Sequence, residues 1–221
     1  KKGNVLVIGN SGVGKSTLIN AIFKENIAVT GWGLKGNTQE LTIHESETLP
    51  FRIIDSKGFE PASPMELLTG NKAVKAVKKW SEECTKLEKD DHGINIIWFC
   101  VDGGTSKLFP KYIEDFCKAT SIWKSVPVIA VITKSTVESQ IQDNIQMVRD
   151  AFAKVKKDGR SLAKIIPVVA KPFIYNENAI VPEFGLEELI EATNQLMPKG
   201  LEAAQKDIAS FTLNLKRIHA R

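Results

Sequence analysis

The sequence has little cysteine and histidine, no targeting segment and no long apolar run. It contains three cysteines, Cys84, Cys100 and Cys117, and three scattered histidines, and neither set has the spacing of a metal site. An odd number of cysteines without a secretory signal predicts reduced thiols in an intracellular, cytoplasmic protein. The longest apolar run, residues 94–101, is far shorter than the roughly 20 residues of a membrane-spanning helix, so the sequence does not predict such a helix.

The sequence also has no strong excess of positive or negative charge. The 30 basic and 26 acidic residues give a net charge of +4, which by itself is too mild to indicate binding to nucleic acid or to a membrane. The chain has 221 residues, of which 43% are hydrophobic. This size and composition suit one sizeable α/β domain with a small appendage.

A glycine-rich motif stands near the start of the chain. The dinucleotide fingerprint G-x-G-x-x-G is absent, but the phosphate-binding P-loop, G-x-x-x-x-G-K-[ST], is present. Its residues and the one that follows are Gly9, Asn10, Ser11, Gly12, Val13, Gly14, Lys15, Ser16 and Thr17. Glycines let backbone N–H groups approach phosphate closely, and the dipole of a following helix favours an anion. The motif predicts a nucleotide site at residues 10–17, with Lys15 at the outer phosphates and Ser16 on Mg²⁺.

The residues around the motif fit this prediction. Residues 4–8 have the pattern of a buried strand, and residues 17–23 have helical spacing. Strand, glycine loop and helix in this order are what the motif requires. A glycine-rich turn that matches by chance is the alternative, and the flanking elements argue against it.

Apolar patterns predict a doubly wound α/β fold. Residues 24–39 are predicted to be a long loop, and helical patterns separate the later strands. The strand at residues 41–44 is joined to the next by a short turn, so we expect it to be antiparallel, at an edge. The sheet should be mostly parallel and six-stranded, with helices on both faces. The strands beyond the first are expected at residues 41–44, 51–54, 94–101, 126–132 and 165–169.

The chain is expected to divide near its end. Residues 1–197 should form the nucleotide-binding domain, whose last helix includes Leu186 and Met197 and ends at Pro198. Residues 198–221 form a C-terminal amphipathic helical extension. This extension either packs on the domain or begins a further domain.

A second motif follows the strand at residues 51–54. Asp55, Ser56, Lys57 and Gly58 come at the carboxyl end of that strand. A carboxylate there, with a glycine three residues later, would stand close to Mg²⁺ and to the terminal phosphate. Asp55 is therefore a candidate metal ligand, and the Gly58 N–H a candidate donor to phosphate.

The P-loop, Thr38 and the segment from Asp55 to Gly58 together resemble the P-loop GTPases of the translation-factor-related class, in particular the Era-like group. The run at residues 97–102 is similar to a strand in Era-like domains of bacteria and fungi that carry a further C-terminal region. The resemblance covers roughly residues 3–197 and implies a Ras-like G domain that binds GTP and GDP.

The resemblance also implies roles for individual residues. Lys15 would contact the β- and γ-phosphates, and Ser16 and Thr38 would bind Mg²⁺, while Asp55 holds a metal-bound water. Gly58 would donate its N–H to the γ-phosphate, so Lys15, Thr38 and Gly58 form the implied catalytic set.

Two segments would act as switches in this resemblance. Residues 24–39 and 58–70 would be ordered by the γ-phosphate and Mg²⁺ and released after hydrolysis. Thr30 is the rival of Thr38 as the magnesium ligand of the first segment.

The base-recognition motif departs from the family form [NT]-K-x-D. Thr133 and Lys134 match it, but Thr136 stands where the family has Asp. A hydroxyl cannot accept two hydrogen bonds from guanine as a carboxylate does. We expect a weakened guanine preference, or a substitute carboxylate, for which Glu138 is the nearest candidate.

Two further positions bear on the same chemistry. Ala170 and Lys171 resemble the end of the S-A-K loop, whose middle N–H contacts the guanine O6. The glutamine that orients the attacking water in Ras-like enzymes is replaced by Phe59, which cannot form a hydrogen bond. We expect slow hydrolysis, unless Glu60 or a partner supplies the polar group.

The leading hypothesis is therefore a Mg²⁺-dependent GTPase that hydrolyses slowly and acts as a conformational switch. One alternative is a nucleotide-binding module with little or no hydrolysis. Another is a P-loop ATPase, or a small-molecule kinase, with relaxed base specificity. A protein effector or a second copy of the chain would bind through the switch segments.

Overall fold

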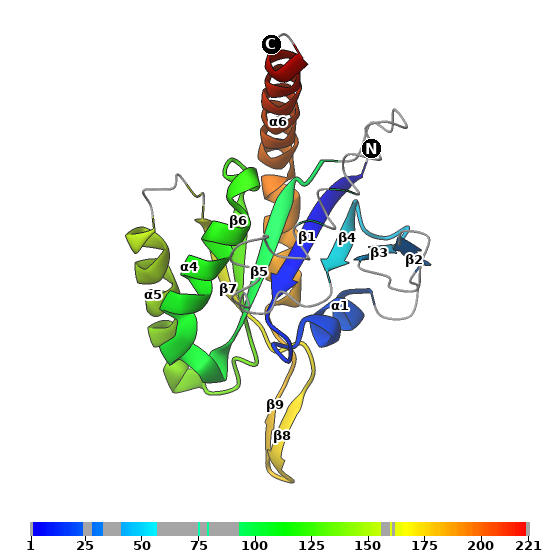
Figure 1. Ribbon diagram of the computed structural model, residues 1–221. Coiled ribbons are helices and arrows are strands. Elements are labelled where there is room, and N and C mark those ends of the chain that lie inside the picture. The colour runs from blue at the N-terminus through cyan, green and yellow to red at the C-terminus, as the bar shows by residue number, and fades with distance from the viewer. Residues whose placement is uncertain are drawn as a thin grey trace.

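The computed structural model describes residues 2–23, 28–32, 41–56, 75, 79, 93–155, 160 and 162–219. Its centre is a seven-stranded sheet in the order β2-β3-β4-β1-β5-β6-β7 (Figure 1). The strands are β1 (Gly3–Gly9), β2 (Ala28–Trp32), β3 (Leu41–Glu45), β4 (Phe51–Ser56), β5 (Ile96–Asp102), β6 (Val128–Thr133) and β7 (Leu162–Pro167).

The strand directions agree with the prediction. β1 pairs in parallel with β4 and β5, and β5, β6 and β7 continue in parallel. β3 runs antiparallel to both of its neighbours. The mostly parallel sheet with one antiparallel strand is therefore confirmed.

The edge of the sheet differs from the prediction. β3 is not the edge strand, because β2 pairs with it, from Ala28 opposite Glu45 to Trp32 opposite Leu41. The prediction of an unbroken loop at residues 24–39 is thus wrong for Ala28–Trp32, and the sheet has a seventh strand. An open edge offers unpaired N–H and C=O groups, and pairing with β3 overrides the weak strand propensity of Gly31.

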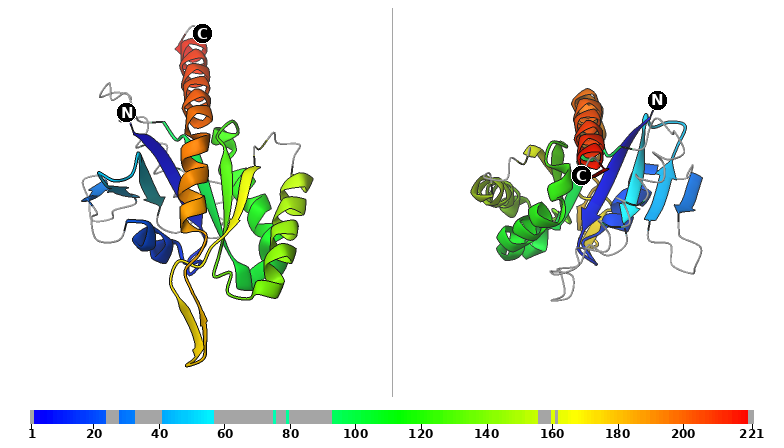
Figure 2. Two further views of the ribbon diagram at one scale, coloured as in Figure 1. Left: turned by 180° about the vertical axis from the view of Figure 1, so that it is seen from behind. Right: turned by 45° about the horizontal axis from the view of Figure 1, so that its top comes forward.

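Helices cover both faces of the sheet, as predicted. The helices are α1 (Lys15–Phe23), η1 (Gly103–Leu108), α4 (Phe109–Ala119), η2 (Ser121–Trp123), α5 (Glu138–Lys154) and α6 (Leu186–His219). Alternate residues of β1 enter two cores: Leu6 and Ile8 pack with α4 and α5, while Val5 and Val7 pack with α1 and α6. The views from opposite sides show α4 on one face and α6 on the other (Figures 1 and 2).

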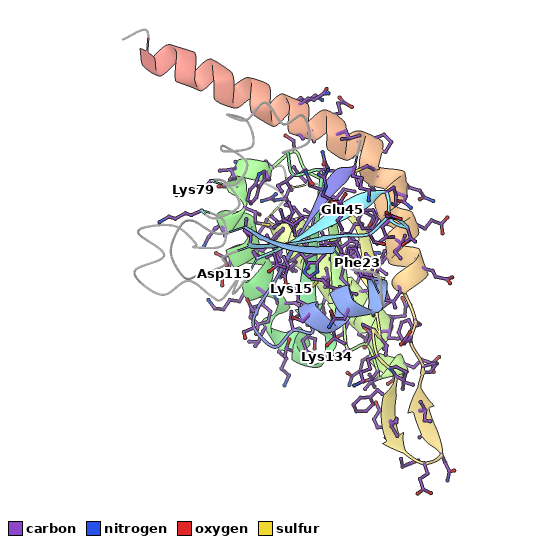
Figure 3. All side chains as sticks on the ribbon, turned by 90° about the vertical axis from the view of Figure 1, so that its right-hand side faces the viewer. Lys15, Phe23, Glu45, Lys79, Asp115 and Lys134 are labelled. Carbon is purple, nitrogen blue, oxygen red and sulfur yellow. The ribbon has the colours of Figure 1, made fainter. Side chains whose placement is uncertain are left out.

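The last helix does not end at Pro198. α6 continues through this proline to His219, so the predicted helix end is wrong. The ring removes one hydrogen bond of the helix, and the axis of α6 bends (Figure 3). Packing beyond the proline stabilises the continuation, because Ala203 and Ala204 are buried and Asn95 Nδ2 donates to the Gly200 carbonyl at 3.3 Å. Within the described ranges, no helix has the length and hydropathy to span a membrane.

Gly200 provides a test of this packing. An added Cβ would stand 2.1 Å from the backbone oxygen of Asn95. Gly200→Ala should therefore lower the free energy of unfolding by about 1–3 kcal/mol, although alanine favours a free helix over glycine by about 1 kcal/mol. Urea denaturation measures the change, with Lys206→Ala on the exposed side of α6 as control. An increase in stability would show that α6 does not pack on Asn95.

A second, two-stranded sheet was not predicted. β8 (Phe173–Asn176) and β9 (Ala179–Val181) form an antiparallel hairpin between β7 and α6. The hairpin projects from the end of the sheet opposite to the free end of α6 (Figures 1 and 2). Its side chains are exposed or half-buried, so it does not contribute to either core.

Candidate functional site

The P-loop joins β1 to α1 as the sequence predicts. Gly12 and Gly14 have φ angles of 77° and 96°, in the left-handed region that residues with a Cβ rarely adopt. The Val13 N–H donates to the Asn10 carbonyl at 3.2 Å, and the Leu18 N–H donates to the Gly14 carbonyl at 3.0 Å. These turns place the loop before the N-terminus of a nine-residue helix. The unpaired N–H groups of a helix start favour an anion there.

The loop encloses one side of a cavity of about 490 Å³. The cavity is lined by all residues from Gly9 to Thr17, together with Asp55 and Lys134. It therefore brings together the predicted phosphate-binding residues and the predicted metal ligands Ser16 and Asp55.

Lys15 and Asp55 form an ion pair inside this cavity. Lys15 Nζ lies 2.8 Å from Oδ1 of Asp55, and the two side chains are 12% and 19% exposed. Lys15 also donates to the carbonyl of Ser56. β1 and β4 are parallel neighbours with Val7 opposite Asp55, so the carboxylate comes close to the start of the P-loop. The pair neutralises two largely buried charges that would be costly to leave alone.

The same residues fit a magnesium ion. Oδ1 of Asp55 is buried and, apart from its ion pair, has no aligned hydrogen-bond donor. The carboxylate and the hydroxyl of Ser16 are hard oxygen ligands, which Mg²⁺ prefers. The described residues contain no group of three or more His, Cys, Asp or Glu that could hold a metal. A magnesium ion here would therefore share oxygens of phosphate and water, which is usual for this metal.

Several predicted residues cannot be placed. Thr38, Gly58, Phe59 and Glu60 lie outside the described residues. Thr30 belongs to β2, where its backbone is opposite Ile43. The roles expected for these residues stay predictions.

The loop after β6 is attached to the P-loop. Lys134, which has a φ of 53°, donates to the Gly12 carbonyl and to Oδ2 of Asp102, each at 2.7 Å. The Thr133 hydroxyl donates to the Val13 carbonyl at 2.5 Å. Thr133 and Lys134 therefore support the phosphate loop as well as lying beside it.

Asp102 was not predicted as a site residue. Its Oδ1 accepts from the Gly104 N–H at 2.8 Å, and its Oδ2 pairs with Lys134. Its signal in the sequence was its place at the carboxyl end of a buried strand, which Asp55 shares. The register of β5 and β6 sets Asp102 opposite Thr133 and thus beside Lys134.

A second cavity of about 330 Å³ adjoins the first. The two share Gly14, Thr17 and Lys134 in their linings. The rest of the second lining is Asp102, Gly104, Thr133, Thr136, Val169, Ala170, Lys171 and Phe173. The structure thus brings together all four predicted base-site residues, Thr133, Lys134, Ala170 and Lys171. Glu138, the candidate substitute carboxylate, is not among the described residues that line either cavity.

Burial shifts the pKa values of two titratable groups near the site. It lowers the pKa of His44 below its ordinary value of 6.5, an effect that the negative charge of Asp55 partly opposes. Burial also raises the pKa of the Cys100 thiol to about 12, although Lys15 opposes the shift. His44 is therefore neutral and Cys100 protonated at pH 7, so neither adds charge to the phosphate cavity.

Comparison with known families identifies the domain. The model of a family described as the 50S ribosome-binding GTPase matches residues 4–134, which include the P-loop, Asp55 and Lys134. The chain belongs to this GTPase family. The resemblance to Era-like P-loop GTPases that the motifs indicated is thus confirmed.

A curated relative supports the same assignment. The chain is similar to GTPase Era of Lactobacillus helveticus (strain DPC 4571), with 22% identity over 202 residues. The match covers 90% of this chain and 56% of the relative, so this GTPase-family chain spans little more than half of the relative's length.

Solved structures of GTP-binding proteins share the fold. A GDP-bound NFeoB mutant from S. thermophilus superposes with a TM-score of 0.51 at 18% identity, covering 89% of this chain and 62% of the other. The small COPII coat GTPase SAR1 from Encephalitozoon cuniculi, in complex with GDP, gives a TM-score of 0.52 at 13% identity, covering 90% and 81%. A GTP-binding protein from Sulfolobus solfataricus, also with GDP, gives 0.52 at 14%, covering 89% and 53%. At these identities the likeness concerns the fold alone.

Proposed function

We propose that this GTPase-family domain is a Mg²⁺-dependent switch that binds GTP and GDP and hydrolyses GTP slowly. The observation that supports it best is the pair of adjoining cavities. One has a glycine-lined anion cradle facing Lys15 and Asp55, and the other holds the residues of the base-recognition loops. A nucleotide has two parts that match these cavities, a charged phosphate chain and a flat base, which its sugar joins.

The ion pair indicates how phosphate and metal would bind. A triphosphate would take the ammonium of Lys15, and Mg²⁺ would take the carboxylate of Asp55, with Ser16 and Thr38 as further ligands. The triphosphate would take the place of Asp55 as the partner of Lys15, and Mg²⁺ would take the place of Lys15 as the partner of Asp55. Nucleotide and metal binding should therefore be coupled. When bound, Mg²⁺ supplies neutralisation of charge on the β- and γ-phosphates.

Slow hydrolysis and a switch follow from the family resemblance. Phe59 cannot orient the attacking water, and Gly58 and Thr38 belong to the segments expected to respond to the γ-phosphate. A protein effector or a second copy of the chain would bind through residues 24–39 and 58–70. We retain residues 1–197 as the nucleotide-binding unit and 198–221 as an extension that α6 joins to it.

Nucleotide titration tests the proposal. Fluorescent GTP, GDP, ATP and XTP are titrated with and without Mg²⁺, and phosphate release is followed in a single turnover. GTP should bind with a strong Mg²⁺ dependence, and its preference over ATP should be modest because Thr136 replaces the acidic residue. Hydrolysis should be no faster than the intrinsic rate of Ras, on the order of 10⁻⁴ s⁻¹, because Phe59 replaces the glutamine that Ras has.

Two outcomes would contradict parts of this proposal. Absence of binding by every purine nucleotide would contradict the whole of it. Binding without phosphate release would favour a nucleotide-binding module, the second candidate, which Phe59 also favours.

A further inference from the structure

The β8–β9 hairpin exposes aromatic side chains beside the nucleotide site. Phe173 and Tyr175 are 45% and 52% exposed. The hairpin begins two residues after Lys171 and projects from the end of the sheet at which the P-loop lies (Figure 1). Exposed aromatic rings are unfavourable in water, and a ligand that covers one gains affinity.

Phe173 and Tyr175 lie on one face of β8, and Ile174, which stands between them in the sequence, lies on the other. The rings of Phe173 and Tyr175 contact each other, so the two side chains share one face although the pairing of the hairpin shifts register between Ile174 and Asn176. Phe173 lines the 330 Å³ cavity together with Lys134 and Ala170. It is the one aromatic side chain among the described residues that line this cavity. Ile174 is 65% exposed and is not part of that lining.

The ring of Phe173 is held in place by Tyr175. The two rings meet edge to face, with centroids 4.7 Å apart and planes at 78°. The Tyr175 hydroxyl donates to the Thr136 carbonyl at 3.3 Å. This bond connects the hairpin to the loop after β6, and Thr136 in that loop lines the same cavity. Phe173 therefore lines the cavity and at the same time contacts a ring that is bonded to the loop after β6.

We infer that Phe173 stacks on the purine ring of the bound nucleotide and that Tyr175 positions it, an inference that rests on the proposed function. Every base has a π-face, so an aromatic ring adds affinity with little regard to the base. Stacking would compensate for the carboxylate that Thr136 cannot replace. The base site would then recognise purine nucleotides by their shape more than by the guanine edge.

The test compares nucleotides with a ligand that lacks the base. Affinities of GTP, ATP and inorganic tripolyphosphate are measured for the whole chain and for Phe173→Ala. The variant should bind GTP and ATP on the order of tenfold or more weakly, by similar factors, and tripolyphosphate as the unchanged chain does. Ile174→Ala, a substitution in the same strand on the opposite face, is the matched control and should leave all three affinities unchanged.

A spectroscopic variant tests stacking directly. Phe173→Trp should show a change in tryptophan fluorescence on addition of GTP that tripolyphosphate does not cause and that the unchanged chain, with its own four tryptophans, does not show. Adding Tyr175→Phe keeps both rings but removes the bond to Thr136, and should reduce this change. If the fluorescence change caused by GTP is as large with Tyr175→Phe as without it, Tyr175 has no positioning role.

Three results would overturn the inference. The first is a Phe173→Ala chain that binds GTP as tightly as the unchanged chain. The second is a Phe173→Ala chain whose affinities for GTP and tripolyphosphate fall by the same factor. The third is a Phe173→Trp chain whose added tryptophan gives no fluorescence change with GTP. Failure of the unchanged chain to bind any nucleotide or tripolyphosphate would instead refute the proposed function and this inference with it, before any variant is made.

Discussion

Lys15→Met is expected to abolish measurable binding of GTP at micromolar concentrations. Lys15 lines the 490 Å³ cavity, where its ammonium pairs with Asp55, and methionine keeps its approximate length without its charge. Removing one partner of a buried charged contact costs about 2–5 kcal/mol, or roughly 30-fold or more in affinity. Isothermal titration with GTP and Mg²⁺ measures the loss.

The control for this variant is Lys111→Met. Lys111 lies on α4, is 66% exposed and pairs with Asp115 outside the cavities. It should leave GTP affinity unchanged. Because Lys15→Met leaves the carboxylate of Asp55 without its cation, circular dichroism must show that the variant is folded. A folded Lys15→Met chain that binds GTP normally would remove Lys15 from the phosphate site.

Asp55→Asn should uncouple nucleotide binding from magnesium. In the unchanged chain Mg²⁺ should raise GTP affinity strongly, by an estimated 100-fold, a typical upper value for coupling between two sites. In the variant this gain should nearly disappear, because an amide is a poorer Mg²⁺ ligand than a carboxylate. In EDTA, however, the variant should bind GTP at least as tightly as the unchanged chain, because Lys15 no longer has to leave a carboxylate.

These opposite effects make the experiment specific. A general loss of structure would weaken binding in both Mg²⁺ and EDTA, whereas loss of the metal site should weaken it only in Mg²⁺. Asp115→Asn, on α4 outside both cavities, is the matched control and should keep the full Mg²⁺ effect. An Asp55→Asn chain that retains this effect would show that Asp55 does not serve the metal.

The candidate site was predictable where a short segment carries its own geometry. The P-loop needs left-handed φ angles at Gly12 and Gly14, and few other residues could stand there. The residues of the two base loops could also be predicted to lie together, since Thr133, Lys134, Ala170 and Lys171 line one cavity, and their role in base recognition stays a prediction. Asp102 was missed because its role depends on strand order, which sets it beside Lys134 from 32 positions away.

Errors in the predicted fold came where tertiary contacts override local preference. Gly31 weakens a strand, yet β2 pairs along the whole of β3. Pro198 normally ends a helix, yet Gly200 and its neighbours pack on Asn95 and α6 continues.

The sequence by itself determined the phosphate cradle, the doubly wound α/β class and the placement of Asp55 at the end of a strand. Each of these depends on residues close together in the chain, where spacing, glycine and apolar periodicity fix the backbone. The tertiary structure alone decided that Lys15 pairs with Asp55, that Asp102 holds Lys134 and that Phe173 lines the second cavity. These contacts join distant segments, and they depend on which strands lie side by side and in what register.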